Sequence, residues 1–249
     1  MVKNHDSLAC SDSACPLPGT MESKAATAAA AAPVAAKGTI QHYIYDPLCG
    51  WCYGAAPLLK AAREVEGLGI ELHGGDMMTG SNRRQVSTQL RNYVMQHDHR
   101  IAAMTGQPFG DDYFNGLLLD STAVLDSEPP ITAILAAQAV AGQGLALLAR
   151  IQSAHYVQGL RVADSAVLRA LAAELAIEIG LDHALFDSKF AELGGAATQA
   201  HIAASRALLA RVGGQGFPTF ALQRGSQIEV LDGGRFFGQA EAWKAVLSA

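Results

Sequence analysis

The stretch Asp46-Pro47-Leu48-Cys49-Gly50-Trp51-Cys52-Tyr53-Gly54 decides the fold of this chain. It follows an alternating apolar run typical of a strand, residues 39–45, and opens a segment, residues 55–66, whose apolar residues are spaced as on one side of a helix. A Cys-x-x-Cys pair at such a turn lies beside the free N–H groups of the helix start, which favours the thiolate form. The pattern therefore predicts a redox pair, in which Cys49 attacks a disulfide and Cys52 resolves the mixed disulfide.

Taken alone, the Cys-x-x-Cys pair also fits half of a zinc site or two inert buried thiols. A structural zinc site needs two further ligands, and the remaining cysteines, Cys10 and Cys15, lie in an N-terminal tail of low-complexity composition. His42 is another candidate ligand, but it lies in the predicted strand, and one imidazole does not complete the set. The sequence therefore favours redox chemistry and predicts no metal ligands.

A second motif lies far downstream, where Gly213-Gly214-Gln215-Gly216-Phe217-Pro218-Thr219 precedes an apolar run. A proline cannot donate to a strand ladder, so Pro218 belongs at the first residue of the strand that follows. Because three of the five residues before Pro218 are glycines, we expect residues 213–217 to form a loop that leads directly into the strand.

The two motifs together resemble the thioredoxin superfamily: Cys49-Gly50-Trp51-Cys52 with Pro57 eight residues after the first cysteine, and Gly-Phe-Pro-Thr before a strand. The resemblance implies that the Phe217–Pro218 bond is cis and lies against the cysteines, although only about 5–6% of X–Pro bonds in folded proteins are cis. It also implies that Phe217 and Pro218 bind the backbone of an extended substrate. Trp51 either packs over that substrate or is half buried against neighbouring helices.

The order of predicted elements is that of a thioredoxin fold interrupted by helices. Residues 39–45, 55–66 and 68–75 form a βαβ unit, which implies parallel strands and a right-handed crossover. A hairpin over residues 219–231 and a closing helix over residues 239–247 make the second half. Helical patterns fill the region between, over residues 85–104, 130–141, 145–158, 165–179, 181–193 and 198–212. We therefore predict an α/β thioredoxin fold with a large all-helical insertion, divided into a disordered tail (1–38), a first half (39–80), the insertion (81–195) and a second half (196–249).

A thioredoxin fold with helices inserted between its halves resembles the DsbA-like oxidoreductases, and the motif around Cys49 is similar to the FrnE-type group of predicted protein-disulfide isomerases. The resemblance covers about residues 39–249. It implies a thiol–disulfide oxidoreductase or isomerase that exchanges disulfides with protein or peptide substrates. It also implies that no cofactor is needed, and that glutathione or a thioredoxin-type protein is a candidate redox partner.

Two departures from the family pattern concern the residues around the cysteines. Gly50 and Trp51 replace the Pro-His dipeptide of DsbA, so the strong oxidant character of DsbA does not carry over. Tyr43 stands where relatives often have a buried acid, and a phenol with a pKa of about 10 is a poor proton acceptor at neutral pH. His42, Asp46 or water could take that role. We expect Gly50, Tyr43 and Asp46 to support the site.

Two other functions fit the same fold. Kappa-class glutathione transferases and 2-hydroxychromene-2-carboxylate isomerases share the helical insertion but use a single serine at the place of Cys49, so retention of both cysteines argues against them. The third hypothesis is a non-enzymatic metal-binding or chaperone-like module. The cluster His97-Asp98-His99 resembles a metal-ligand arrangement, but neighbouring helical positions point apart, which favours a solvated face.

Composition narrows the range of partners and compartments. The chain has 249 residues, half of them hydrophobic, and a formal net charge of −5. With no densely basic stretch, we expect neither nucleic acid nor an anionic membrane surface as a partner. The sequence contains no run of about 18 or more strongly apolar residues, so we predict no transmembrane helix. The alanine-rich segment after Lys24 lacks a leucine-rich core and follows a charged stretch, so we interpret it as a linker. This predicts a cytoplasmic protein, with the periplasm as the alternative.

Overall fold

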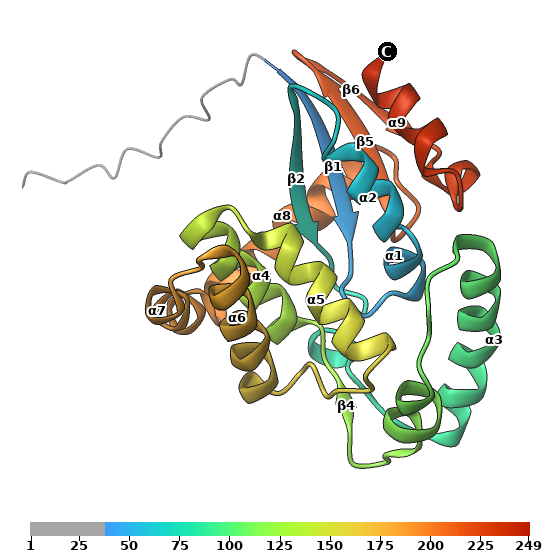
Figure 1. The fold of residues 1–249 in the computed structure, drawn as a ribbon, viewed down its shortest axis with the longest axis vertical. Coiled ribbons are helices and arrows are strands. Elements are labelled where there is room, and N and C mark those ends of the chain that lie inside the picture. Colours follow the sequence, from blue (N-terminus) through green and yellow to red (C-terminus); the bar gives the residue numbers. More distant parts are fainter. Residues whose placement is uncertain (1–37) are drawn as a thin grey trace, which may run out of the picture. The chain divides into compact units, whose positions relative to one another are not determined.

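In the computed structural model, which describes residues 38–249, the chain forms a four-stranded sheet in the order β2-β1-β5-β6 (Figure 1). The strands are β1 (Thr39–Tyr45), β2 (Leu68–Gly74), β5 (Thr219–Arg224) and β6 (Gln227–Leu231). β1 pairs in parallel with β2 and antiparallel with β5, so the two halves of the fold meet along the central strand β1. The predicted tail, with Cys10 and Cys15, lies outside the described residues except for Gly38.

The helical segment after β1 is divided into α1 (Gly50–Gly54) and α2 (Ala56–Ala62), whereas the sequence predicts one uninterrupted helix that starts after the motif. Pro57 explains the break, because in a continuous helix its ring would meet the carbonyl of Tyr53 four residues earlier. That carbonyl instead accepts a hydrogen bond of 3.2 Å from the side-chain amide of Gln107. The predicted start of the helix was therefore wrong, since helix begins within the redox motif.

Helices cover both faces of the sheet. On one face, the ring of Tyr43 stacks on Phe220 of β5 at 5.0 Å, and Trp243 of α9 (Ala240–Ser248) packs on Phe220 at 4.9 Å. α1 and α2 lie on this same face, and α8 (Ala196–Arg211) lies on the other (Figure 1). Successive residues of β1 therefore contact different layers, because side chains alternate between the faces of a strand.

Between β2 and α8 the chain forms a block of helices. These are α3 (Thr88–Thr105), α4 (Glu128–Ala141), α5 (Gly144–Tyr156), α6 (Ser165–Ile179) and α7 (His183–Leu193). α4 packs against α5, α7 and α8, while α3 packs separately against α1 (Figure 1). The side chain of Ile131 in α4 is fully buried, and a Cβ at Gly74 would lie 2.9 Å from it, so α4 is packed tightly onto the end of β2. This arrangement confirms the predicted thioredoxin fold with a helical insertion.

Several short elements were not predicted. β3 (Arg84–Gln85) pairs antiparallel with β4 (Val124–Leu125), and a π-helical turn (Asp112–Gly116) runs into a 3₁₀ turn (Leu117–Leu119). Further 3₁₀ turns occur at Gly80–Asn82 and Gly233–Phe236. Elements of two to five residues are too short to show a periodic apolar pattern, which is the signal on which a sequence-based assignment rests.

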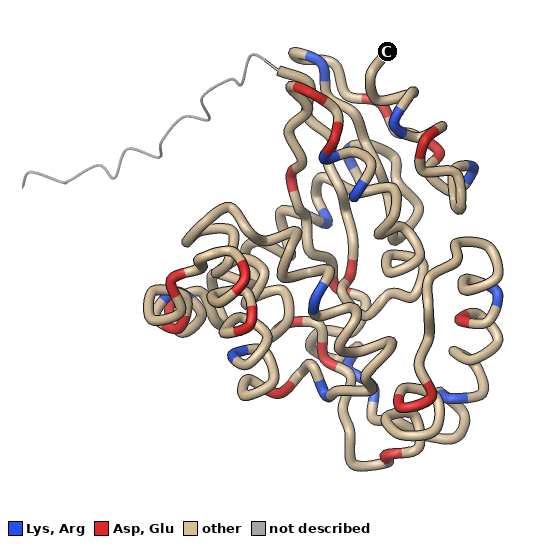
Figure 2. Tube along the Cα trace, viewed as in Figure 1, with Lys and Arg blue, Asp and Glu red and all other residues tan. Residues whose placement is uncertain are grey.

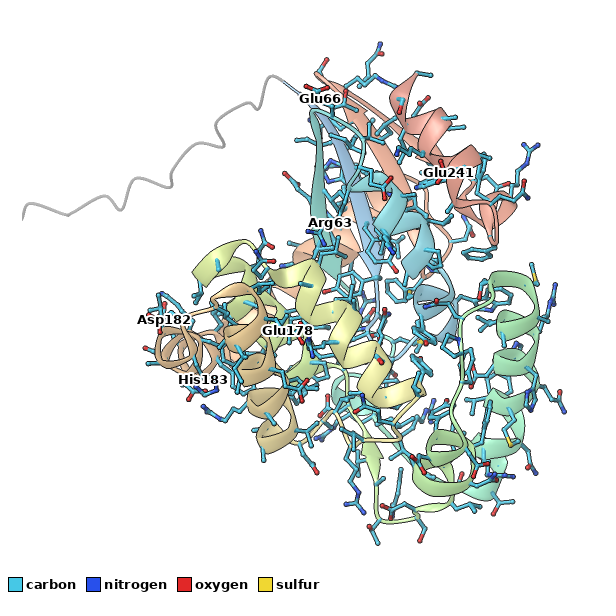
Figure 3. All side chains as sticks on the ribbon, viewed as in Figure 1. Arg63, Glu66, Glu178, Asp182, His183 and Glu241 are labelled. Carbon is cyan, nitrogen blue, oxygen red and sulfur yellow. The ribbon has the colours of Figure 1, made fainter. Side chains whose placement is uncertain are left out.

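Charged residues of both signs are interspersed along the described chain (Figure 2). On the surface between α5 and α6, Arg150 pairs with Glu174 and Glu178, the latter labelled in Figure 3. Exposed pairs of this kind contribute about 0–1 kcal/mol each, so the buried apolar side chains hold these helices together.

Among residues 38–249 there is no helix with the length and apolar character that a membrane crossing requires.

Candidate active site

The two cysteines of the motif lie at the end of β1, where the chain turns into α1. Cys49 occupies the N-cap position of α1 in an extended conformation, and Cys52 lies within its first turn. Cys49 is 6% exposed, whereas Cys52 is fully buried, and both are free thiols in this structure. Burial raises the pKa of Cys52 well above its ordinary value, and the hydrogen bond and charge of the neighbouring Cys49 add to the rise. The geometry therefore leaves Cys49 as the sulfur that an incoming disulfide can reach.

The loop before β5 brings the second motif against the first. The Phe217–Pro218 peptide bond is cis, as the resemblance implied. The carbonyl oxygen of Phe217 lies 3.6 Å from the Sγ atom of Cys49, which donates to it, although the two residues are 168 positions apart in the sequence. Pro218 immediately precedes β5, as expected for a residue that cannot donate to the ladder.

The side chain and the backbone of Phe217 have different surroundings. A Cβ placed on Gly75 would lie 2.1 Å from the ring of Phe217, so this ring packs directly on the backbone just after β2. Gly75 is needed there because any larger side chain would displace the aromatic ring. The carbonyl of Phe217, in contrast, faces Cys49. The part of Phe217 that reaches the thiol is therefore its backbone.

Trp51 lies between the C-terminal segment and the insertion. Its ring stacks on that of Phe237 at 5.4 Å, and the guanidinium carbon of Arg100 lies 5.8 Å from its centroid, within range of a cation–π contact. Trp51 also lines a groove of about 430 Å³, together with Phe217, Pro218 and Phe237. Trp51 is therefore half buried against α3 and the C-terminal segment, and it also borders the groove beside the cis-proline.

The fold has close counterparts among solved structures. The cytosolic disulfide reductase DsbM from Pseudomonas aeruginosa is 55% identical in sequence, with a TM-score of 0.77, over 84% of this chain and 96% of that chain. A structure of the same protein with GSH matches at 54% identity and a TM-score of 0.76 over the same shares. Identity at this level over nearly the whole neighbour decides the family. The chain belongs to the DsbA-like family of thiol–disulfide oxidoreductases.

More distant solved structures share the same fold. A putative protein disulfide isomerase from Nitrosomonas europaea is 24% identical, with a TM-score of 0.67 over 84% of this chain and 96% of that one. A probable DsbA oxidoreductase from Streptomyces coelicolor is 19% identical, with a TM-score of 0.56 over 84% of this chain and 88% of that one. A scan against protein-family models and a search of curated proteins gave no match. This DsbA-like chain is an enzyme that exchanges disulfides, which confirms the predicted activity.

In this family member, Tyr43 connects α1, the redox helix whose N-cap residue is Cys49 and which contains Cys52, to the central strand β1. Its hydroxyl donates a hydrogen bond of 3.1 Å to the carbonyl oxygen of Cys52. Burial raises the pKa of Tyr43 well above its ordinary value, and the nearby cysteines add to the rise, so the phenol stays protonated. Tyr43 is therefore a hydrogen-bond donor that positions α1, and it does not accept protons at neutral pH.

Asp46 is fully buried at the end of β1 and joins three segments of the fold. Its carboxylate accepts hydrogen bonds from the backbone N–H groups of Leu48 and Met77, both at 2.9 Å, and from the Ser127 hydroxyl at 2.7 Å. Burial raises the pKa of Asp46 to about 6, although the three hydrogen bonds lower it. The carboxylate thus connects the loop before Cys49 with the segment after β2 and the start of α4.

Asp98 is a residue beside the site that the sequence analysis placed on a solvated face. The structure shows it only 3% exposed on α3, where its Oδ2 atom accepts a hydrogen bond of 2.9 Å from the Tyr113 hydroxyl. A Cβ at Gly50 would lie 2.7 Å from Oδ1 of Asp98, so α3 packs directly over the turn between the cysteines. A larger side chain at Gly50 would collide with this carboxyl group. The interpretation of His97-Asp98-His99 as solvated was wrong for Asp98, because α3 turns that one position inward.

Proposed function

We propose that this oxidoreductase works as a cytoplasmic disulfide reductase, with Cys49 as the attacking thiol, Cys52 as the resolving thiol and glutathione as the electron donor. The observation that carries the assignment is the cis Phe217–Pro218 peptide, whose carbonyl lies 3.6 Å from the Sγ atom of Cys49 while Cys52 is buried behind it. The direction of electron flow and the compartment follow the 55% identical protein, which is named a cytosolic disulfide reductase.

The reaction begins when the Cys49 thiolate attacks one sulfur of the substrate disulfide. The substrate S–S bond breaks, its second sulfur leaves as a thiolate and takes up a proton, and a mixed disulfide joins Cys49 to the substrate. Cys52 then loses its proton and attacks the sulfur of Cys49. This releases the reduced substrate and forms a Cys49–Cys52 disulfide, which two glutathione thiols reduce while they are oxidised to glutathione disulfide.

The timing of the two attacks follows from the burial of the cysteines. The raised pKa of Cys52 keeps this residue a neutral thiol while Cys49 carries the mixed disulfide. Release therefore requires a proton acceptor near Cys52. Asp46 is the buried carboxylate that acts on Cys52 through its charge, and its pKa of about 6 leaves it ionised at pH 7. We assign Asp46 to positioning of the loop and to acceptance of this proton.

Substrate binding is assigned to the groove beside the cis-proline. An extended peptide segment can hydrogen-bond to the backbone before Pro218, in the manner of a strand added to a sheet edge. The rings of Trp51 and Phe237 border the same groove and supply apolar contact area. Glutathione, a tripeptide, fits this mode of binding, and a 54% identical structure carrying GSH supports it as the donor.

A trapping experiment tests the cysteine roles. In Cys52→Ser protein, a peptide disulfide or glutathione disulfide should leave a stable mixed disulfide on Cys49, identified by mass spectrometry of the digested protein. Cys49→Ser should form no such adduct and should lose disulfide reduction with glutathione as the donor. Full reductase activity in the Cys49→Ser protein would rule out the assignment.

Direction and compartment need separate measurements. The reduction potential of the Cys49–Cys52 pair, measured against glutathione redox buffers, should lie between that of thioredoxin, about −270 mV, and that of the glutaredoxins, about −200 to −230 mV, because glutathione must be able to reduce the pair. A value near that of DsbA, about −120 mV, would instead indicate an oxidant. Fractionation of the native cells should recover the protein with cytoplasmic markers, and recovery with the periplasm would contradict the proposed compartment.

A further inference from the structure

Three polar side chains gather on the face of the sheet that α8 covers, away from the redox helix. His42 of β1 lies opposite Glu71 of β2 in the parallel register, and His73 lies two residues further along the same face of β2. Tyr43, the neighbour of His42, points to the other face and holds α1 there. The cluster His42–Glu71–His73 is therefore separated from the cysteines by the sheet itself.

The potential ligand atoms of the cluster face one another. Nδ1 of His42 lies 2.9 Å from Nε2 of His73 and 3.3 Å from Oε2 of Glu71, and Nε2 of His73 lies 3.8 Å from the same oxygen. Their average separation is about 3.3 Å, which is what a tetrahedron requires when its ligands are about 2.0–2.1 Å from a central Zn²⁺. Small side-chain rotations would equalise the three distances.

The second ring nitrogen of His42 is held in the way that metal-binding histidines require. Nε2 of His42 lies 2.8 Å from Oε1 of Gln223 on β5, so this nitrogen carries the proton and donates it. Nδ1 is then left with a lone pair directed at Glu71 and His73. Such an outer hydrogen bond fixes the tautomer and the ring orientation of a ligating histidine.

Burial and exposure within the cluster suit an ion-binding site. The side chain of His42 is 7% exposed and that of His73 is 19% exposed, whereas that of Glu71 is 53% exposed. The two imidazoles are therefore fixed by the sheet, and the cluster opens to solvent at Glu71. A cation can enter from this side, and water can occupy a fourth ligand position.

We propose that His42, Glu71 and His73 form a binding site for one Zn²⁺ ion, or for a divalent ion of similar preference, that joins β1 to β2 on the sheet face opposite the redox helix. Two imidazole nitrogens and one carboxylate oxygen are ligands that zinc takes in proteins, with water completing the tetrahedron. Hard ions such as Mg²⁺ prefer all-oxygen sites, so this site discriminates against them. The assignment is independent of the direction of the thiol chemistry.

Binding can be measured on the full chain by calorimetry with Zn²⁺ and by absorption spectroscopy with Co²⁺. The cobalt complex should show the visible bands of tetrahedral nitrogen and oxygen ligation, apart from any thiolate charge-transfer band. Glu71→Gln and His73→Ala should each lower the zinc affinity at least about 100-fold, and Gln223→Leu should lower it roughly 10–100-fold. His97→Ala, which removes an exposed histidine outside the cluster, should leave the affinity unchanged.

Thermal unfolding gives a second readout. Zn²⁺ at about 100 times its dissociation constant should raise the Tm of the wild-type chain by roughly 5–10 °C, and Mg²⁺ should not. Glu71→Gln keeps the size of an exposed side chain, so this variant should fold and lose the zinc-dependent rise. The proposal is wrong if zinc binding is not saturable, if it persists undiminished in both Glu71→Gln and His73→Ala, or if cobalt shows only thiolate ligation.

Discussion

Replacement of Asp98 by asparagine should make the protein more stable at pH 8 while leaving its stability near pH 4 unchanged. Asp98 is 3% exposed beside the turn between the cysteines, and the Tyr113 hydroxyl donates to it at 2.9 Å. Burial raises the pKa of this carboxyl group from 3.8 to about 7, against the opposing effect of the Tyr113 hydrogen bond. Asparagine has nearly the same shape, and its side-chain oxygen can accept the same hydrogen bond.

The sign and size of the effect follow from proton linkage. Because the folded state binds the proton of Asp98 more tightly than the unfolded state, the stability from this group is fully present below about pH 4 and is lost as the pH rises through about 7. The difference between the two pKa values corresponds to at most about 4 kcal/mol, and some solvent access reduces the expected loss to roughly 2–4 kcal/mol. The Asp98→Asn protein carries no charge at this position and should not lose this stability.

Urea unfolding followed by circular dichroism at pH 5, 6, 7 and 8 measures the effect. The free energy of unfolding of Asp98→Asn should exceed that of the wild type by an amount that grows with pH. Asp46 contributes in the same direction in both proteins and therefore cancels in the difference. Asp112→Asn, which changes an exposed carboxylate, serves as the control. A difference that is constant from pH 5 to pH 8 would show that Asp98 does not titrate in this range and would refute the reasoning.

Two further substitutions test the packing of α1. Gly50→Ala should lower the free energy of unfolding by about 1–3 kcal/mol, because its Cβ would lie 2.7 Å from Oδ1 of Asp98. The control Gly69→Ala, in β2, meets only ordinary contacts and should change the free energy of unfolding little, so equal urea midpoints for the two variants would contradict the tight packing. Tyr43→Phe should lower the free energy of unfolding by about 1–3 kcal/mol, because the carbonyl of Cys52 loses the hydroxyl that donates to it while the stacked ring remains. Urea titration measures the loss, and an unchanged midpoint would show that this hydrogen bond does not contribute to stability.

Much of the fold could be predicted because its elements have local signals. The alternation in residues 39–45 and the apolar spacing in residues 165–179 gave a strand and a helix at the bounds that the structure shows. The break at Ala55 differs from the predicted single helix because the apolar spacing continues through it, and Pro57 alone marks the place where the carbonyl of Tyr53 leaves the helical pattern.

The candidate site divides in the same way between local and long-range information. The spacing of Cys49 and Cys52 and the Gly-Phe-Pro-Thr motif are visible in the chain, and they led to the correct enzyme class. The inward position of Asp98 was not visible, because one polar residue between two histidines on a long helix has no periodic signal of burial. Whether such a residue faces water depends on the element that packs over it, in this case α1.

The sequence by itself determined the Cys-x-x-Cys spacing, the order of the main strands and helices, and the division of the thioredoxin fold by helices, since each of these depends on residues close together in the chain. The tertiary structure alone decided that the carbonyl of Phe217 meets Cys49, that Asp46 ties three segments together, and that His42 lies against Glu71 and His73. Those contacts join residues from 29 to 168 positions apart, and they are fixed by strand register and helix packing, which no short pattern in the chain encodes.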